Sequence, residues 1–182
     1  MPLKQLQYMV YASLMAALTA AGAYIHVPLG PVPMVLQNLF VVLAGLLFGA
    51  RWGFTSVAIY LLAGALGIPV FAGGKGGIAH FMGPTGGYLL GFAAAAFITG
   101  TIAERSNERK ILEAVAAVIG FLTVYALGVP WLKAVTGMSW EKAVVVGMLP
   151  FLPGDMIKAF LAFTLARAIR PVVIRSREPI SP

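Results

Sequence analysis

The chain has 182 residues and a net charge of +7, yet 60% of its residues are hydrophobic and only 10% are charged. A soluble domain of this length carries roughly a quarter charged residues, so this chain lacks the polar groups to cover a water-facing surface. The composition therefore excludes an ordinary soluble protein and predicts a polytopic protein of the lipid bilayer.

Apolar runs suited to crossing a bilayer recur along the whole chain, since a transmembrane helix needs about 20 apolar residues or slightly fewer. They cover about Leu6–Ile25, Met34–Ala50, Phe54–Ile68, Thr85–Ala103, Ile111–Trp131 and Asp155–Ile169. The sequence therefore predicts an all-α integral membrane protein, a compact bundle of six transmembrane helices. We expect a single membrane domain over residues 1–170 and a polar cytoplasmic tail over residues 171–182.

The connections between these runs are unusual for solvated loops. The first, "HVPLGPVP", is stiffened by prolines. The third, "PVFAGGKGGIAHFMGP" over residues 69–84, has glycines that break a helix but too many apolar residues for a linker in water. We expect this segment to fold back onto the bundle. Pro150 and Pro153 interrupt the chain just before the last span.

The basic residues gather at the two termini and at the second-to-third and fourth-to-fifth connections. Nine of the thirteen fall there: Lys4, Arg51, Arg105, Arg109, Lys110, Arg167, Arg170, Arg175 and Arg177. Cytoplasmic loops of membrane proteins carry such an excess, so the pattern predicts that both termini are cytoplasmic. It also accounts for the positive charge without a nucleic-acid partner.

The sequence lacks the residue patterns of common metal sites, thiol sites and nucleotide-binding loops. His26 and His80 are too far apart for a helical metal pair, and the chain has no cysteine. The stretch "GGKGG" lacks the glycine spacing and the hydroxyl residue of a nucleotide phosphate loop. We therefore expect no metal, no cofactor and no enzymatic activity, and any ATP must be hydrolysed by another chain.

Polar residues from four connections fall at the outer ends of the predicted spans. They are Gln37, Asn38, Lys75, His80, Thr85, Tyr88, Asp155 and Lys158. Asp155 follows Pro153-Gly154 and could cap the last helix, with Lys158 one turn on as its counter-ion. However, a charge at the centre of a membrane helix costs about 2.5–3.5 kcal/mol, and ionisable residues inside a membrane usually mark a ligand path. The ligand-binding interpretation is therefore favoured over the helix cap with its counter-ion.

The small residues at two places in the chain can be interpreted as helix-packing positions or as contacts with a ligand or a partner. In "GPTGGYLLGF", Gly86 and Gly87 can pack against another helix, can let a ligand touch the backbone beside the hydroxyls of Thr85 and Tyr88, or can do both. On the first span, Ala12 and Ala16 repeat at a spacing that lets helices approach closely in lipid. The spacing alone does not distinguish a contact inside the bundle from a contact with a partner.

Three stretches in order, "PLGPVPMVLQ", "GPTGGYLLGF" and "FLPGDMIKA", resemble the biotin-specific substrate-binding (S) components of energy-coupling factor (ECF) transporters, the BioY family. The resemblance covers about residues 12–168. It implies a subunit in a prokaryotic plasma membrane that captures biotin near the outer face. It further implies a transmembrane coupling protein and two ATPases as partners, with Ala12 and Ala16 as the contact for the coupling protein and residues 27–33 as a lid.

The residues fit the chemistry of that ligand. Biotin has a ureido ring with two N–H donors and a carbonyl, an apolar bicycle and a carboxylate tail. The resemblance matches Asp155 and Lys158 to an acid–lysine pair of the family, and Lys75 would suit the tail. We further expect the binding site to include Gln37, Thr85, Gly86, Gly87, Phe81 and Tyr88. An S component for another water-soluble vitamin is the main alternative, with an intramembrane enzyme or a channel as weaker ones.

Overall fold

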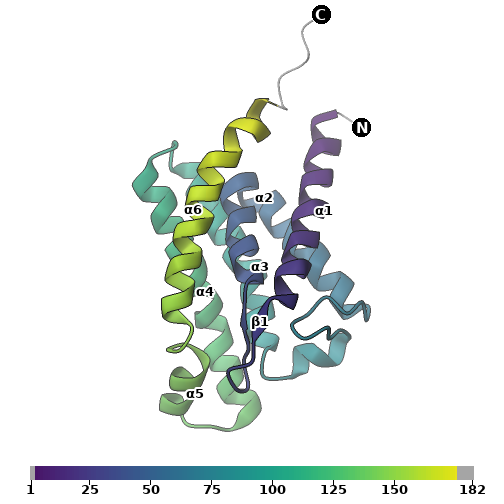
Figure 1. The fold of residues 1–182 in the computed structure, drawn as a ribbon, viewed down its shortest axis with the longest axis vertical. Helices are drawn as coiled ribbons and strands as arrows, with labels where there is room; N and C mark the ends of the chain where they lie inside the picture. The colour runs from purple at the N-terminus through teal and green to yellow at the C-terminus, as the bar shows by residue number, and fades with distance from the viewer. Residues whose placement is uncertain (1–2, 176–182) are drawn as a thin grey trace, which may run out of the picture.

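The computed structural model describes residues 3–175, which are mostly helical (Figure 1). Its helices are α1 (Leu3–Tyr24), α2 (Gln37–Ala65), α3 (Gly86–Arg105), α4 (Lys110–Thr136), α5 (Trp140–Gly147) and α6 (Leu152–Arg175), with a short 3₁₀ helix, η1, at Ile78–Met82. Within the described residues, four helices are long and apolar enough to cross a membrane, and the bent pair α5–α6 makes a fifth candidate.

Helix α2 doubles back on itself and consists of two antiparallel arms. Gly49 has φ 78° and ψ −175° in the middle of it. The hydroxyl of Tyr60 donates a hydrogen bond of 3.2 Å to Gln37 Oε1, although a straight helix would place these residues about 35 Å apart. The two arms correspond to the second and third predicted spans, and the chain reverses just before the predicted turn at "RWG".

Only glycine suits the reversal point. A positive φ is costly for other residues, and a Cβ on Gly49 would lie 2.0 Å from Glu104 Oε1. That carboxylate instead accepts a 3.1 Å hydrogen bond from the backbone N–H of Ala50, at the start of the second arm. A negative charge at this position also complements the helix dipole.

The other helices pack around this hairpin. Helix α3 lies between α2 and α4, α1 packs on α2, and α6 packs on α2 and α4. Glycines allow close approach: a Cβ on Gly91 of α3 would lie 3.0 Å from Val124 Cα on α4. Helices α5 and α6 meet at 50°, where Pro150 interrupts the chain and Pro153 occupies the first turn of α6, a position that tolerates proline.

The small-residue face of α1 points into the bundle. Ala12 is fully buried and Ala16 is 6% exposed. Within this chain the two alanines are used for close helix packing, and their contact with a partner protein stays a prediction. The opposite face of α1, with Ser13 and Ala17, is exposed instead.

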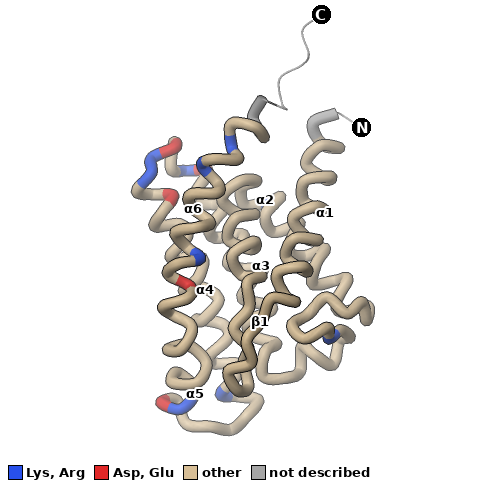
Figure 2. The backbone as a smooth tube through the Cα atoms, viewed as in Figure 1, with Lys and Arg blue, Asp and Glu red and all other residues tan. Residues whose placement is uncertain are grey.

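One end of the bundle carries most of the charge. Helix α1 begins and α6 ends there (Figure 1), and Figure 2 shows basic and acidic residues gathered over the α3–α4 connection and the last turns of α6. Buried Glu113 accepts hydrogen bonds from Arg167, at 3.0 Å, and from Arg170. Arg170 also donates to the backbone carbonyl of Leu46, at 2.9 Å.

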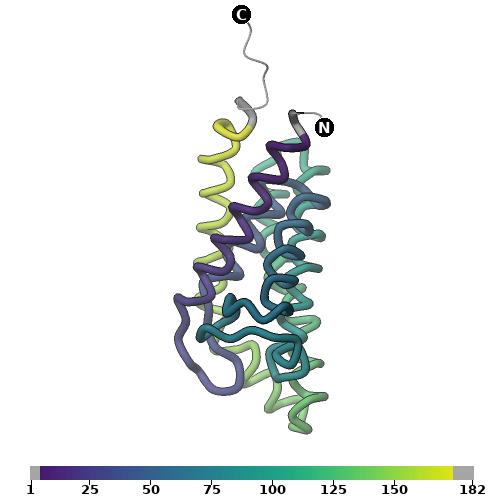
Figure 3. Tube along the Cα trace, turned by 90° about the vertical axis from the view of Figure 1, so that its right-hand side faces the viewer, coloured from purple at the N-terminus to yellow at the C-terminus, as the bar shows by residue number. Residues whose placement is uncertain are grey.

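The opposite end is closed by two connections that lie near each other (Figure 3). The first contains strands β1 (His26–Val27) and β2 (Met34–Val35), paired antiparallel; these two very short strands were not expected. The second is residues 66–85. Phe71 in this segment is fully buried and fills a slot that Gly64 leaves open, since a Cβ there would lie 2.1 Å from the ring. The segment therefore folds back onto the bundle, as predicted.

Helix ends differ from the predicted spans in two places. Helix α4 continues through Pro130 to Thr136, and α6 continues to Arg175, past the predicted end of the last span. The rest of the predicted polar tail, residues 176–182, lies outside the described residues.

Candidate binding site

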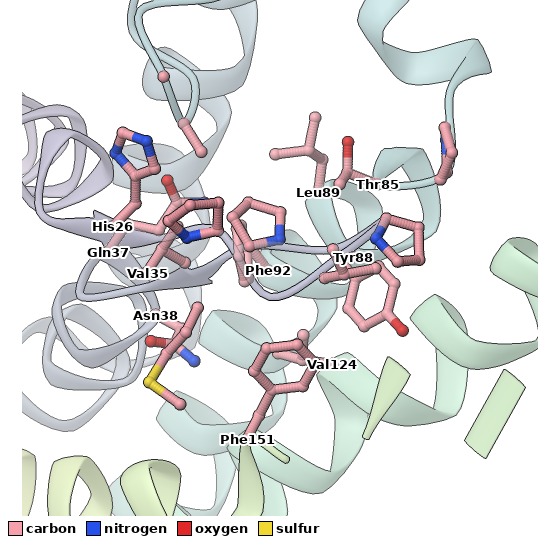
Figure 4. A pocket seen from close by; sticks show the side chains of 18 of the residues that line it. His26, Val35, Gln37, Asn38, Thr85, Tyr88, Leu89, Phe92, Val124 and Phe151 are labelled. Atoms are coloured by element: carbon pink, nitrogen blue, oxygen red, sulfur yellow. The ribbon is translucent and has the colours of Figure 1, made fainter. Parts of the chain in front are cut away.

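A cavity of about 370 Å³ lies at the closed end of the bundle, within the size range of small-molecule sites. Its wall draws on the first connection, the first turn of α2, residues 72–85, and helices α3, α4 and α6. Figure 4 shows Gln37 and Asn38 on one side, Thr85 and Leu89 on another, and Phe92, Val124 and Phe151 between them. Apolar rings therefore line a chamber with polar groups at separate points.

Asp155 is the most heavily hydrogen-bonded group of the wall. Its Oδ1 accepts from Lys158 Nζ at 2.7 Å and from Asn38 Nδ2 at 3.1 Å, while Oδ2 accepts from the hydroxyl of Tyr125. Asp155 is 5% exposed and Lys158 8% exposed. Three elements, α2, α4 and α6, therefore meet at one carboxylate.

The alternative role of Asp155, capping the last helix, is not what the structure shows. Helix α6 already begins at Leu152, so Asp155 stands within its first turn. Its backbone N–H donates to the carbonyl of Phe151 at 2.9 Å. The carboxylate complements the helix dipole there, but its hydrogen bonds go to side chains that line the cavity.

Gln37 and Asn38 expose different polar atoms. Because Tyr60 donates to Gln37 Oε1, the carbonyl oxygen of that amide is engaged and its NH₂ group remains as a donor. Asn38 has the opposite arrangement: its NH₂ group donates to Asp155, and its buried Oδ1 has no hydrogen-bond partner among the residues that the structure describes. A buried acceptor without a partner is costly, so Asn38 Oδ1 is ready to accept a donor from a ligand.

The start of α3 forms another wall of the cavity. The ring of Tyr88 lines the cavity, and its hydroxyl donates to the carbonyl of Gly147 at 2.8 Å. Thr85 Oγ1 lies 3.2 Å from His80 Nε2. Trp131 Nε1 donates to the carbonyl of Gly83 at 3.0 Å and fixes the turn before the helix.

Three of the predicted site residues lie outside the cavity wall. A Cβ on Gly86 would lie 1.8 Å from the carbonyl oxygen of Phe81, and one on Gly87 would lie 2.2 Å from Trp131 Cβ. The two glycines therefore serve close packing, and a contact of their backbone with the ligand stays a prediction. The ring of Phe81 packs edge-on against Phe71 and does not face the chamber.

The other predicted residues come together around one cavity: Gln37, Lys75, Thr85, Tyr88, Asp155 and Lys158. Lys75 and His26 are exposed and His80 is half-buried. Burial lowers the pKa of the His80 imidazole below its usual value, and the nearby Lys75 ammonium lowers it further. Among the described residues, no group of three or more acids and histidines could hold a metal ion.

The sequence did not single out two important residues. Tyr125 lies in the middle of a predicted span, and its phenol oxygen, a polar atom in an apolar helix, was the only signal available. Asn38 was noted as polar but was not assigned to the site. Its importance depends on the contact with Asp155, 117 positions further along the chain, and no local pattern reveals such a contact.

Comparison with known proteins agrees with the fold over nearly the whole chain. A family model described as the BioY family matches residues 1–175. The chain is 46% identical over 158 residues to a probable biotin transporter BioY of Pyrococcus horikoshii, covering 87% of this chain and 93% of that protein. It is 40% identical over 169 residues to the biotin transporter BioY of Thermotoga maritima, covering 93% and 99%.

A solved structure is similar as well. The crystal structure of the S-component for biotin from an ECF-type ABC transporter matches with a TM-score of 0.88 and 29% sequence identity, over 94% of each chain.

Proposed function

This chain belongs to the BioY family, and on that premise we propose that it takes up biotin as the S component of an ECF-type transporter. The observation that carries the proposal is the cavity whose buried carboxylate, Asp155, is held by side chains from three helix segments. The relatives are named as transporters, in agreement with the expectation that the chain is not an enzyme.

The polar groups around Asp155 suit a cyclic urea. A ureido ring offers two N–H donors and one carbonyl acceptor. In our proposal, Asp155 and the unpaired Oδ1 of Asn38 accept the two N–H groups. Lys158 and the NH₂ group of Gln37 are the available donors for the carbonyl. Hydrogen bonds to a charged group contribute roughly 1.5–3 kcal/mol each, so this end of the cavity supplies both affinity and orientation.

The remaining wall suits the rest of the molecule. Phe92, Phe151 and the ring of Tyr88 line the chamber and can pack against an apolar bicycle. Lys75 and Thr85 line the cavity beyond them and can bind a carboxylate tail. A ligand with a urea at one end and a carboxylate at the other would therefore satisfy both ends of the cavity.

We also propose six membrane crossings with both termini in the cytoplasm, in the plasma membrane of a prokaryote. The two arms of α2 support this count, because each arm is a separate pass and α5–α6 together form the last one. The charge at the end where α1 begins and α6 ends supports the orientation. The cavity then opens toward the outside, under the connection between α1 and α2.

The partners in this proposal are a transmembrane coupling protein and two ATPases. The sequence of this chain has no phosphate loop, so the energy for uptake must come from such subunits. A coupling protein that approaches α1 would meet the face with Ser13 and Ala17, because Ala12 and Ala16 are buried.

Equilibrium binding of biotin to the purified protein in detergent tests the central claim. We expect saturable binding at a ratio of one ligand per chain, weaker binding of desthiobiotin, which keeps the cyclic urea, and no binding of lipoate, which lacks it. A panel of other water-soluble vitamins tests the alternative substrate. Absence of biotin binding would overturn the proposal.

A further inference from the structure

The outer part of the cavity is positively charged without internal compensation. The first 103 residues contain no aspartate or glutamate, and this stretch supplies His26, Lys75 and His80 to the cavity wall. Lys75 forms no ion pair with any residue that the structure describes. Among the described residues of the wall, the one carboxylate is that of Asp155 on α6, and Figure 1 shows α6 and residues 66–85 on opposite sides of the bundle.

His80 is positioned to respond to a negative charge. Its ring stacks on Phe71, with centroids 5.1 Å apart and planes 20° apart, and Phe71 is anchored in the slot at Gly64. Its Nε2 lies 3.2 Å from Thr85 Oγ1. The imidazole is thus held rigidly in the wall, between Thr85 on one side and an aromatic face on the other.

We propose that His80 takes up a proton when the carboxylate of the ligand binds, and that protonated His80, Lys75 and Thr85 together form the carboxylate-binding site. This inference rests on the proposed function. In the neutral ring with its proton on Nδ1, Nε2 accepts the hydroxyl hydrogen of Thr85. In the imidazolium both nitrogens carry hydrogen, so Nε2 donates to Thr85 Oγ1 and the hydroxyl hydrogen is free for the carboxylate.

The neighbouring groups determine the direction of the effect. The helix η1 that carries His80 packs on α2 and α3. The titratable groups around it are Tyr88 of α3, Lys75 of its own segment and His26 of β1, all in the same cavity wall. Tyr60 of α2 contacts the ring of Phe71, on which His80 stacks. None of these groups is a carboxylate. Burial and Lys75 hold the pKa of free His80 below its usual value, so the imidazole is neutral near pH 7, and only a bound anion would favour its charged form.

The direction of the pH dependence of biotin affinity follows from this change in the pKa of His80. If the carboxylate raises the pKa of His80, binding takes up a proton, and affinity rises as the pH falls through the bound-state pKa toward the lower pKa of the free protein. We expect biotin to bind roughly fivefold more tightly at about pH 5.5 than at about pH 8, since a pKa difference of one unit corresponds to at most tenfold. Biotin amide, which has no carboxylate, should bind equally at both pH values.

Isothermal titration calorimetry on the purified full chain measures both the affinity for biotin and the number of protons taken up. Titrations in two buffers of different ionisation enthalpy give the number of protons taken up with biotin, and we expect a clear fraction of one proton. His80→Asn should abolish the uptake and the pH dependence, and a cooperative thermal unfolding transition verifies that the variant is folded. Lys75→Gln should weaken biotin binding but retain the pH dependence, and His26→Gln should retain it too.

Three results would each overturn the inference: biotin affinity that does not change with pH, equal proton uptake with biotin amide, or pH dependence that survives in His80→Asn. If that variant fails to fold, the comparison of biotin with its amide on the unmodified protein still decides. A failure of the proposed function is a different result, because then neither biotin nor its amide binds at any pH.

Discussion

The hydroxyl of Tyr125 on α4 donates a hydrogen bond to Oδ2 of Asp155 on α6. This contact fixes the plane of the carboxylate, because the other oxygen is held by Lys158 and Asn38. Tyr125→Phe should weaken biotin binding by roughly tenfold, the effect of losing a hydrogen bond to a charged group. Titration calorimetry measures it. Tyr11→Phe, which removes a hydroxyl outside the cavity wall, is the matched control, and equal affinities in the two variants would contradict the prediction.

Asp155 itself should matter more than the group that orients it. Asp155→Asn keeps the size of the side chain but removes the charge that pairs with Lys158 and accepts from Tyr125. We expect a loss of at least about 2 kcal/mol in binding free energy, roughly thirtyfold in affinity. Glu141→Gln, in the first turn of α5, is the control for losing a carboxylate elsewhere. Unchanged binding in Asp155→Asn would remove Asp155 from the site.

The slot for Phe71 can be tested through stability. Gly64→Ala places a methyl group 2.1 Å from the Phe71 ring, and overpacking of this kind costs about 1–3 kcal/mol. Thermal unfolding of the protein in detergent should show a lower midpoint. Phe71→Leu makes room for the added methyl group, so the double variant should lose less stability than the sum of the two single changes. Simple additivity would mean that the two residues are not coupled.

Substitutions at two alanines on opposite faces of α1 can distinguish an effect on stability from an effect on assembly with the coupling protein. Ala12→Leu inserts a larger side chain at a fully buried position and should destabilise the protein by about 1–3 kcal/mol. Ala17→Leu, on the exposed face, should leave thermal stability and biotin binding unchanged. If the coupling protein docks on this face, uptake of radiolabelled biotin by cells with the complete transporter should fall. Uptake at the unmodified rate in Ala17→Leu would place the docking surface elsewhere.

Much of the architecture was predictable from hydrophobic runs and prolines. The second and third spans are short, yet the sequence separated them correctly, because "RWG" interrupts two apolar stretches; the structure shows that Gly49 makes this reversal. Helix ends were harder to predict. The apolar run predicted an end at Trp131, one residue after Pro130, whereas α4 continues to Thr136. A proline inside a membrane helix can be accommodated by its neighbours.

Residues of the candidate site could be predicted from the sequence where a charged or polar residue lies in otherwise apolar surroundings. Asp155 and Lys158 are charges in an apolar stretch, and Gln37 follows a proline-rich turn. The roles of Gly86 and Gly87 were not decided by the sequence, because a glycine next to a ligand and a glycine next to a helix look alike. The free acceptor on Asn38 depends on hydrogen bonds between separate helices, which a single sequence does not encode locally.

The charged end of the bundle, where α6 ends, offers a last test, in which stability should change without an effect on the binding site. Glu113 is 1% exposed and accepts from Arg167 and Arg170, and Arg170 also donates to the carbonyl of Leu46 at the end of the first arm of α2. This cluster therefore ties α2, α4 and α6 together. Removing one partner of a buried ion pair leaves the other charge uncompensated and costs about 3–5 kcal/mol.

Glu113→Gln should accordingly lower the midpoint of thermal unfolding of the purified protein. Biotin affinity at low temperature should stay near that of the unmodified chain, because the cluster uses Arg167 and Arg170 near the end of α6, whereas the first two turns of α6 line the cavity. Glu108→Gln is the control, since Glu108 contributes only its backbone carbonyl to Arg167 and its side chain is exposed. Because Glu113 is buried, although Arg167 is partly exposed, added salt should reproduce only a small part of the effect. Equal midpoints for the two variants would show that the ion pairs contribute no net stability.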